Sequence, residues 1–419
     1  MDQYPWEVIR NGLALPQHAQ KWWDKTAPKL GHMLQGAGYD AHEQYKILLF
    51  FWRYIVIHFG PYPEESQKDS SLPFWKSFMT DDNSPMELSW AWDSINSLPE
   101  IRFSIEAIGF KAGTAEDPSN QLETLKLMSE LKVTQPQFVW ELFEYFHNAF
   151  QPSSAGPNSN QEFPHRSSLG LGFKCSRVSM RIGAYLTPPV LDPTASWNYT
   201  YDVISKFRKD ETSFPTARQL HDFLTQTETG KELRFVGLGI DCVKINKSRL
   251  KIYVRSRETS VESMRNILTM NGTMPEPWTD SILKKLYTLL DMVAPGYKDS
   301  QVNTAQTAGM LYNFDIHSGR KEPYSRIYIP VKHYGIDDLS IAQGLERFQK
   351  IQGRTDEDQS RSYLEMLRQV YNKRKLEDGK GLQTFIAISP KDGSLAIAAY
   401  VSPHAYTERG PGEWPLKIG

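Results

Sequence analysis

Short segments in which hydrophobic and polar residues alternate occur in pairs along the chain, and stretches of helical periodicity separate the pairs. Two such segments joined by a short polar or glycine-containing turn predict a β-hairpin. We predict hairpins from 86–92 with 101–109, 168–175 with 178–187, 233–244 with 249–257, 307–316 with 325–332, and 382–388 with 394–401. We predict helices in 40–58, 121–150, 216–228, 260–292, 339–350 and 359–375. The chain therefore predicts ten antiparallel strands with helices between the hairpins.

The polar positions of these strands indicate how the sheet is arranged. In 249–255 the odd positions are polar or aromatic and the even positions are aliphatic, and 101–108 and 326–329 alternate in the same way. Because side chains alternate between the two faces of a strand, each polar set lies on one face. Ten strands closed into a barrel would have no free edge and a chamber inside. Strands with their polar face in water alternate too, so the pattern alone leaves both arrangements open.

The composition narrows the possible functions. The chain carries 48 Lys and Arg against 49 Asp and Glu, so no basic excess predicts nucleic-acid binding. Its longest apolar stretch, 47–59, has 13 residues and contains Arg53, which makes it too short to span a bilayer. Two cysteines, Cys175 and Cys242, cannot build a disulfide framework, and reduced thiols are typical of the cytoplasm. We expect a cytoplasmic protein that binds neither nucleic acid nor membrane.

Basic and phenolic residues share the polar faces of the predicted strands, and acidic residues are few there. If these faces line one chamber, their positive charge needs an anion, and a diphosphate suits several Arg and Lys side chains. Tyrosine rings can stabilise a nearby cation. Such a chamber fits the ionisation of an allylic diphosphate. The residues are Arg102, Arg181, Arg249, Lys251, Arg326, Tyr185, Tyr253, Tyr328 and Tyr400.

Seven segments carry a resemblance to a known family. They are Pro-Trp-Glu-Val at 5–8, Gln-Lys-Trp-Trp at 20–23, Ser-Pro-Met-Glu-Leu-Ser-Trp at 84–90, Pro-Glu-Ile-Arg-Phe at 99–103, Arg-Leu-Lys-Ile-Tyr at 249–253, Arg-Ile-Tyr-Ile-Pro at 326–330 and Ala-Tyr-Val-Ser-Pro at 399–403. Together they resemble the dimethylallyltryptophan synthase family of soluble aromatic prenyltransferases. The resemblance implies an α+β fold in which residues 1–419 form one domain, a ten-stranded antiparallel β-barrel (the ABBA barrel) with a central chamber, surrounded by α-helices.

The resemblance also implies an activity and the residues that carry it. A prenyl group, in first place dimethylallyl, would leave its diphosphate as an allyl cation and be attacked by an aromatic acceptor. Glu87 would accept a hydrogen bond from the indole N–H of the acceptor. Tyr185, Tyr253, Tyr328 and Tyr400 would shield the cation. The residues implied for diphosphate binding are Arg102, Arg249, Lys251, Tyr253, Arg326, Tyr328 and Tyr400.

The acceptor stays open at this stage. Tryptophan, a tryptophan-containing cyclic dipeptide and a larger indole alkaloid all fit the resemblance. A phenolic polyketide is the alternative, because Trp90-Ala-Trp92 after Glu87 also resembles that subgroup. A non-catalytic barrel that binds an anionic ligand is a third reading, but it would not need Glu87. Both a monomer and a homodimer are compatible with the sequence.

Two positions depart from the family pattern. Gly183 stands where the family usually has a lysine two residues before Tyr185, and we expect Arg181, one repeat earlier on the same face, to bind diphosphate in its place. Ala396 stands where a second tyrosine is common. Both changes remove side-chain bulk and would leave room for a larger prenyl chain or acceptor. Neutral drift explains them equally well.

We expect no metal and no other cofactor. Asp81-Asp82 and Asp337-Asp338 lack the third aspartate of a magnesium-binding motif, and several basic side chains are available to neutralise the diphosphate without magnesium. The base that removes the ring proton is not identified by the sequence. Lys174, His165 and Arg166 lie near the strand that provides a basic residue in the family, and water could also accept the proton.

Overall fold

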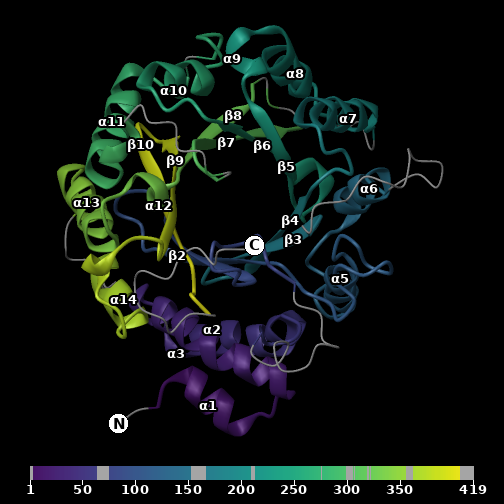
Figure 1. Ribbon diagram of the computed structural model, residues 1–419, viewed down its shortest axis with the longest axis vertical. Helices are drawn as coiled ribbons and strands as arrows, with labels where there is room; N and C mark the ends of the chain where they lie inside the picture. The colour runs from purple at the N-terminus through teal and green to yellow at the C-terminus, as the bar shows by residue number, and fades with distance from the viewer. Residues whose placement is uncertain are drawn as a thin grey trace.

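In the computed structural model, ten antiparallel strands form one closed barrel and helices surround it, as the view along the barrel in Figure 1 shows. The structure describes residues 3–63, 75–151, 167–208, 213–274, 276–298, 305, 307–318, 320, 322–354 and 362–405. Every predicted hairpin is present, so the predicted α+β barrel is confirmed. The strands are β1 (Met86–Trp92), β2 (Glu100–Ile105), β3 (Leu169–Cys175), β4 (Met180–Leu186), β5 (Arg234–Asp241), β6 (Arg249–Ser256), β7 (Met310–His317), β8 (Tyr324–Ile329), β9 (Gln383–Lys391) and β10 (Ser394–Val401).

Each strand pairs with its neighbours in sequence, and β1 pairs with β10 to close the barrel. On β6 the even residues Leu250, Ile252 and Val254 are fully buried beneath the helices, while Arg249 and Tyr253 keep part of their surface. The same alternation runs around the barrel, so the apolar face points outward and the polar face inward. Partial exposure of the inner side chains means that solvent reaches the inside of the barrel.

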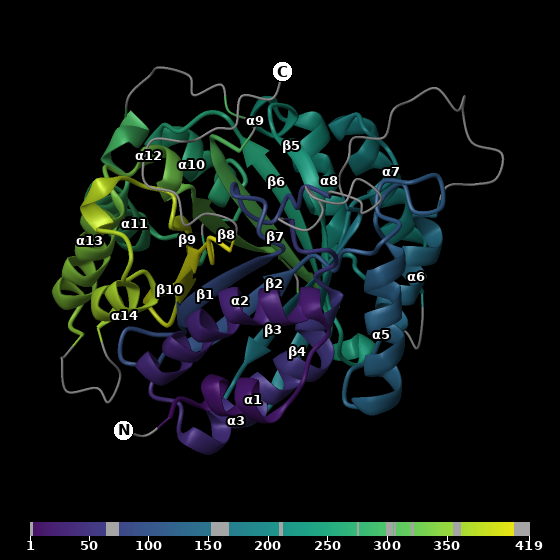
Figure 2. The same cartoon turned by 60° about the horizontal axis from the view of Figure 1, so that its bottom comes forward.

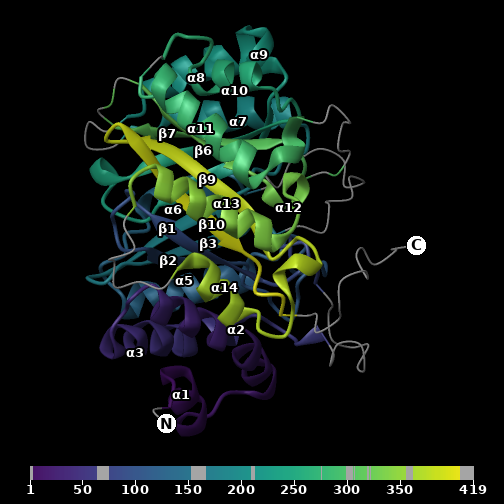
Figure 3. The same cartoon turned by 90° about the vertical axis from the view of Figure 1, so that its left-hand side faces the viewer.

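The helices form the outer layer. They are α1 (Pro5–Gly12), α2 (Gln17–Gly36), α3 (Ala41–Phe50), α5 (Leu122–Thr134), α6 (Glu141–Ala149), α7 (Pro193–Lys206), α8 (Thr216–Gln226), α9 (Glu228–Lys231), α10 (Val261–Leu268), α11 (Asp280–Val293), α12 (Val331–Tyr334), α13 (Asp338–Ile351) and α14 (Tyr363–Val370). Figure 2 brings the N-terminal helices α1 to α3 forward, and Figure 3 shows α11 and α13 beside the strands β9 and β10. Helix α11 contacts β10 and packs against α13.

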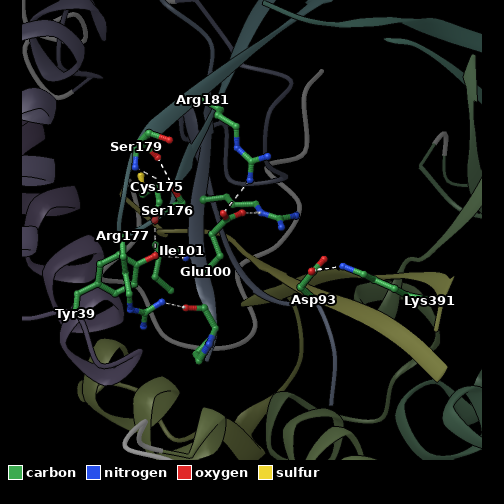
Figure 4. Close-up of polar contacts among 12 residues, drawn as sticks. Tyr39, Asp93, Glu100, Ile101, Cys175, Ser176, Arg177, Ser179, Arg181 and Lys391 are labelled. Atoms are coloured by element: carbon green, nitrogen blue, oxygen red, sulfur yellow. Dashed lines mark hydrogen bonds and ion pairs between the residues drawn. The ribbon is translucent and has the colours of Figure 1, made fainter. Parts of the chain in front are cut away.

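The N-terminal helices are held to the strands by a buried tyrosine (Figure 4). The Tyr39 hydroxyl donates to the Cys175 carbonyl at the end of β3 and accepts from the Ile101 amide of β2 at 3.1 Å. Arg177 lies over the Tyr39 ring at 4.4 Å and donates to the Ala37 carbonyl at 2.7 Å. These contacts fix the β3–β4 turn against the start of the chain.

The two ends of the barrel differ. At one end short turns join the strands of each hairpin, such as Asp392-Gly393, where both residues have positive φ. At the other end the connections between hairpins carry the helices. We call them the turn end and the connection end.

Candidate active site

In the part of the chain that the structure describes, six basic side chains of β2, β3, β4, β6 and β8 occupy inner-face positions near the turn end. Five of them belong to the predicted set, and the structure adds Lys174 of β3. In register, Lys174 lies opposite Arg102 of β2 on one side and opposite Arg181 of β4 on the other. We call this group the cation cluster. Its members are Arg102, Lys174, Arg181, Arg249, Lys251 and Arg326.

Carboxylates lie among these cations, so the expectation that acidic residues are few on the inner faces is wrong. Asp241 at the end of β5 binds Arg249 Nε at 2.7 Å and Lys251 Nζ at 2.5 Å. Asp315 of β7 accepts from Arg249 and, at 2.6 Å, from the Asn313 amide. With Glu100, three carboxylates face six basic side chains. An excess of positive charge therefore remains when all of them are ionised.

Glu100 joins two members of the cluster at the turn end. It accepts from Arg102 Nε at 2.6 Å and from Arg181 Nη2 at 3.2 Å, and Figure 4 shows Arg181 directed toward it. The Arg181 side chain is 56% exposed, compared with 22% for Arg102. Arg181 therefore lies at the rim of the barrel, and its role in place of a lysine at Gly183 stays a prediction.

Neighbouring cations hold Asp241 and Glu100 in the ionised state. Burial acts to raise the pKa of Asp241, but Lys251, Arg249 and Lys174 outweigh it and the pKa is strongly lowered. Burial likewise opposes ionisation of Glu100, and the Arg102 and Arg181 guanidinium groups still lower its pKa. These carboxylates are charged in the physiological range, so the free cluster is partly neutralised from within.

The four predicted tyrosines lie side by side across the barrel. Ring centroids are 6.1 Å apart for Tyr185 and Tyr253, 6.1 Å for Tyr253 and Tyr328, and 6.0 Å for Tyr328 and Tyr400. They come from β4, β6, β8 and β10, one from each successive hairpin. Burial raises the pKa of Tyr185, Tyr253 and Tyr400, so these phenols are neutral. We call the four rings the tyrosine belt.

Two inner-face glycines make room for the belt. A Cβ at Gly172 would lie 3.0 Å from Tyr185 Cε2, and one at Gly239 would lie 3.2 Å from Tyr253 Cε2. Both distances are below ordinary van der Waals contact, so these rings rest directly on glycine backbone. Three tyrosines of the belt also pack in one apolar cluster with neighbouring side chains, which we call the apolar wall: Ala91, Leu311, Phe385, Ala387 and Ala398. The inner face of β10 also carries Ala396, which is paired with Ser389.

Glu87 lies at the opposite end from the cation cluster. It is the second residue of β1, pairs with Ser104 of β2 and accepts a hydrogen bond from Thr384 Oγ1 at 2.6 Å. Burial raises its pKa to about 7, while the Thr384 hydrogen bond and the Lys332 charge act in the other direction. Lys332 of α12 is itself bound to Asp81 at 2.6 Å. Glu87 is therefore a carboxyl that changes charge near neutral pH.

The two tryptophans that follow Glu87 point away from the barrel interior. Trp90 and Trp92 are 1% and 3% exposed and both contact the Tyr363 ring of α14. Ala91 between them faces inward. The Trp90-Ala-Trp92 motif is therefore core packing on the outer face of β1, and it does not distinguish acceptors by contact.

The paired aspartates have structural partners. Asp82 accepts from the Thr80, Ser84 and Ser402 hydroxyls, and Asp337 caps α13 through the Ser340 amide. Asp338 is fully buried and accepts from the Gln383 amide at 2.9 Å. Within the described parts of the chain, no group of three or more His, Cys, Asp or Glu is placed to hold a metal ion.

In the same parts, no helix is both long enough and apolar enough to cross a bilayer.

Sequence reasoning named Lys174 only as a possible base, and it missed Asp241 and Asp315. Each of the three residues follows another inner-face residue of its strand by two positions: Gly172, Gly239 and Asn313. Because side chains alternate along a strand, this spacing would have placed all three on inner faces. Two of the proposed bases, His165 and Arg166, lie outside the described residues. Lys391 at the end of β9 also reaches the turn end, where it is bound to Asp93 (Figure 4).

Comparison with known proteins agrees with this geometry. The family model described as tryptophan dimethylallyltransferase matches residues 18–366. Prenyltransferase anuH of Penicillium roqueforti is 30% identical, covering 93% of this chain and 89% of that protein. The 4-O-dimethylallyl-L-tyrosine synthase of Claviceps purpurea is 29% identical, with coverages of 94% and 89%. The crystal structure of NotF with brevianamide F and DMSPP has a TM-score of 0.80 at 21% identity, covering 96% of this chain and 99% of that one.

Proposed function

The chain belongs to the tryptophan dimethylallyltransferase family of aromatic prenyltransferases, and from that premise we propose that it transfers a dimethylallyl group from dimethylallyl diphosphate to an indole inside the barrel. The observation that carries the proposal is the order of groups along the barrel. The cation cluster lies at the turn end, the tyrosine belt comes next, and Glu87 lies toward the connection end. This order matches the order of diphosphate, allyl group and acceptor in the reaction.

The cation cluster would bind the diphosphate. When the bond between the allyl carbon and the bridging oxygen breaks, the electron pair stays on the diphosphate, whose negative charge rises. Arg249, Lys251 and Arg326 can stabilise that charge through charge-assisted hydrogen bonds. Arg326 is the most available of the three, because in the described structure it has no ion pair or hydrogen bond of its own.

The tyrosine belt would surround the allyl cation. Ring faces attract a cation, and the apolar wall beside the belt leaves water little to bind. Both features protect the cation from capture by water, which would give dimethylallyl alcohol. The neutral phenols can also donate to diphosphate oxygens, which supports the diphosphate role proposed for Tyr253, Tyr328 and Tyr400.

Glu87 would bind the acceptor. Its ionised carboxylate accepts a hydrogen bond from an indole N–H, which orients the ring and raises its electron density. A ring carbon attacks the allyl cation, a carbon–carbon bond forms, and loss of the ring proton restores aromaticity. NotF, which shares this fold, was crystallised with brevianamide F.

A phenolic acceptor is the second candidate. The relative from Claviceps purpurea is a 4-O-dimethylallyl-L-tyrosine synthase, and Glu87 could equally accept a hydrogen bond from a phenol.

We propose that the reaction needs no metal, because the cation cluster carries the positive charge that magnesium would otherwise supply.

Incubation with dimethylallyl diphosphate and a set of acceptors tests the function. The set contains tryptophan, a tryptophan-containing cyclic dipeptide, tyrosine and a hydroxyxanthone, each with and without a chelator. We expect mass spectrometry to show one added C5H8 unit on an indole, and the same yield in chelator. Prenylation of the phenols alone would establish the second candidate. If no acceptor is prenylated and no diphosphate is released from the donor, the proposal is overturned.

A further inference from the structure

Lys174 is a basic side chain that the reaction described above does not use. It lies on the inner face of β3, between Arg102 and Arg181 on the neighbouring strands. Its neighbours on the same face are glycines, with Gly172 two residues earlier and Gly183 beyond it on β4. A Cβ at Gly183 would lie 3.8 Å from Lys251 Nζ, so the absence of a side chain at Gly183 lets Lys251 lie over this part of β4.

The Lys174 ammonium has no anionic partner of its own. Each carboxylate nearby is committed elsewhere: Glu100 to Arg102 and Arg181, and Asp241 to Arg249 and Lys251. Across the residues that the structure describes, Lys174 makes no hydrogen bond or ion pair. A lysine placed inside a barrel among other cations is costly unless it is uncharged or meets an anion.

We propose that Lys174 binds the diphosphate of the prenyl donor and supplies the ammonium group that Gly183 does not provide. The inference rests on the proposed function, since it assigns a further residue to the same site. Gly172, two residues before Lys174 on this face, pairs with Gly183, over which Lys251 and Asp241 lie. The Lys174 side chain therefore adjoins the part of the cluster where the anion would be held. Glu87 is displaced from Lys174 by two strands and two residues of register, so Lys174 belongs to the diphosphate end.

Binding by Lys174 would be coupled to uptake of a proton. Burial and the Lys251 charge lower the pKa of Lys174 well below its ordinary value, with Arg102 and Arg249 adding to the effect and Asp241 opposing it. Arg181 and Glu100 complete the charged groups that face it from the neighbouring strands. The incoming diphosphate reverses this balance, because its negative charge favours the ammonium form. One proton then passes from solvent to Nζ, and the ammonium donates it in a hydrogen bond to a phosphate oxygen.

Calorimetry with inorganic diphosphate and with dimethylallyl thiolodiphosphate tests the inference. Titrations in two buffers of different ionisation enthalpy at the same pH report the number of protons taken up. The proteins are the wild type, Lys174→Met, Lys174→Arg and, as a control on an exposed face of α11, Lys284→Met. For wild type and Lys284→Met we expect uptake approaching one proton. For Lys174→Met we expect no such uptake, at least tenfold weaker binding and an unchanged KM for the acceptor, with partial rescue in Lys174→Arg.

The outcomes separate the two proposals. If wild type prenylates an acceptor but Lys174→Met binds diphosphate with wild-type affinity and proton uptake, the Lys174 inference is wrong and the function stands. If Lys174→Met lowers kcat and leaves diphosphate binding intact, Lys174 acts on the ring proton and the inference is again wrong. If wild type binds no diphosphate, the proposed function fails first. A thermal melt of each variant checks that the protein is folded under the conditions of the titrations.

Discussion

Glu87 is the residue on which pH acts most directly in the proposed reaction. Its carboxyl must be ionised to accept a hydrogen bond, and burial raises its pKa to about 7. We expect kcat/KM for the acceptor to increase as pH rises through about 7, because this parameter reports the free enzyme. In Glu87→Gln this rise with pH should disappear, and kcat/KM for the acceptor should fall by about 100-fold or more. A rising limb centred near the ordinary pKa of a glutamate would contradict the assignment.

The raised pKa of Glu87 also makes the stability of the fold depend on pH. Its folded pKa of about 7 lies above the ordinary 4.5, so the protonated carboxyl stabilises the fold. That contribution is full below pH 4.5 and is lost as pH rises through 7. Glu87→Gln keeps the shape without the charge. At pH 8 we expect urea denaturation to show it more stable than wild type by about 1–3 kcal/mol. At low pH the two should be equal, and a gain that is independent of pH would argue against this origin.

Several site residues could be predicted one by one, but their partners could not. Alternation along β6 and β8 placed Arg249, Lys251 and Arg326 on one face, and the structure brings them together. The carboxylates were missed because Asp241 and Asp315 lie on other strands than Arg249, near the ends of β5 and β7. Only the register across β5, β6 and β7 sets them beside Arg249, and register is not readable from the alternation of a single strand.

At the scale of elements, β5, β6 and β7 are joined by ionic contacts as well as by backbone pairing. Arg249 binds both Asp241 and the buried Asp315. Arg249→Met should abolish prenyl transfer and also cost about 3–5 kcal/mol, because it leaves Asp315 charged without its partner. The double variant Arg249→Met/Asp315→Asn should recover most of that stability in urea and none of the activity.

The matched control for Arg249→Met is Lys284→Met, which should change neither prenyl transfer nor the free energy of unfolding. If the single variant is as stable as wild type, the contact between Arg249 and Asp315 does not contribute to the fold as described.

The tyrosine belt depends on glycine in the strands beneath it. In Gly172→Ala the added Cβ would press on the Tyr185 ring, which must shift by a few tenths of an ångström. We expect the protein to fold and still ionise its donor, but to release severalfold more dimethylallyl alcohol per prenylated product, as measured by chromatography. Gly12→Ala, at a glycine with open space around it and no positive φ, is the control for added bulk alone. An unchanged ratio would show that the belt does not exclude water.

The strands were predicted better than the helices for identifiable reasons. The predicted helix 121–150 is divided into α5 and α6 around Pro136, and 260–292 is divided into α10 and α11 around Gly272 and Pro277. Both breaks follow from residues that end helices. Helix α2 was not predicted, since Pro28 and mixed polarity hide its periodicity, although Trp22 and Trp23 are almost fully buried in it.

At the scale of the whole molecule, we propose that the chain unfolds as one domain. The first and last strands pair with each other, so no part of the barrel is complete without both ends of the sequence. We expect far-UV and near-UV circular dichroism to report one coincident transition in urea. Two separated transitions would contradict it. A chain ending before β10 should lose this transition, because β1 and β9 would become open edges.

The contrast between the two ends of the barrel has a consequence for how such an enzyme can diversify. We expect insertions and deletions to be tolerated in the long helical connections at the end of the barrel where Glu87 lies, and hardly at all in hairpin loops as tight as Asp392-Gly393. Donor chemistry is thereby insulated from acceptor choice. New aromatic partners can be accommodated by remodelling one mouth of the cylinder while the machinery that breaks the carbon–oxygen bond is inherited unchanged.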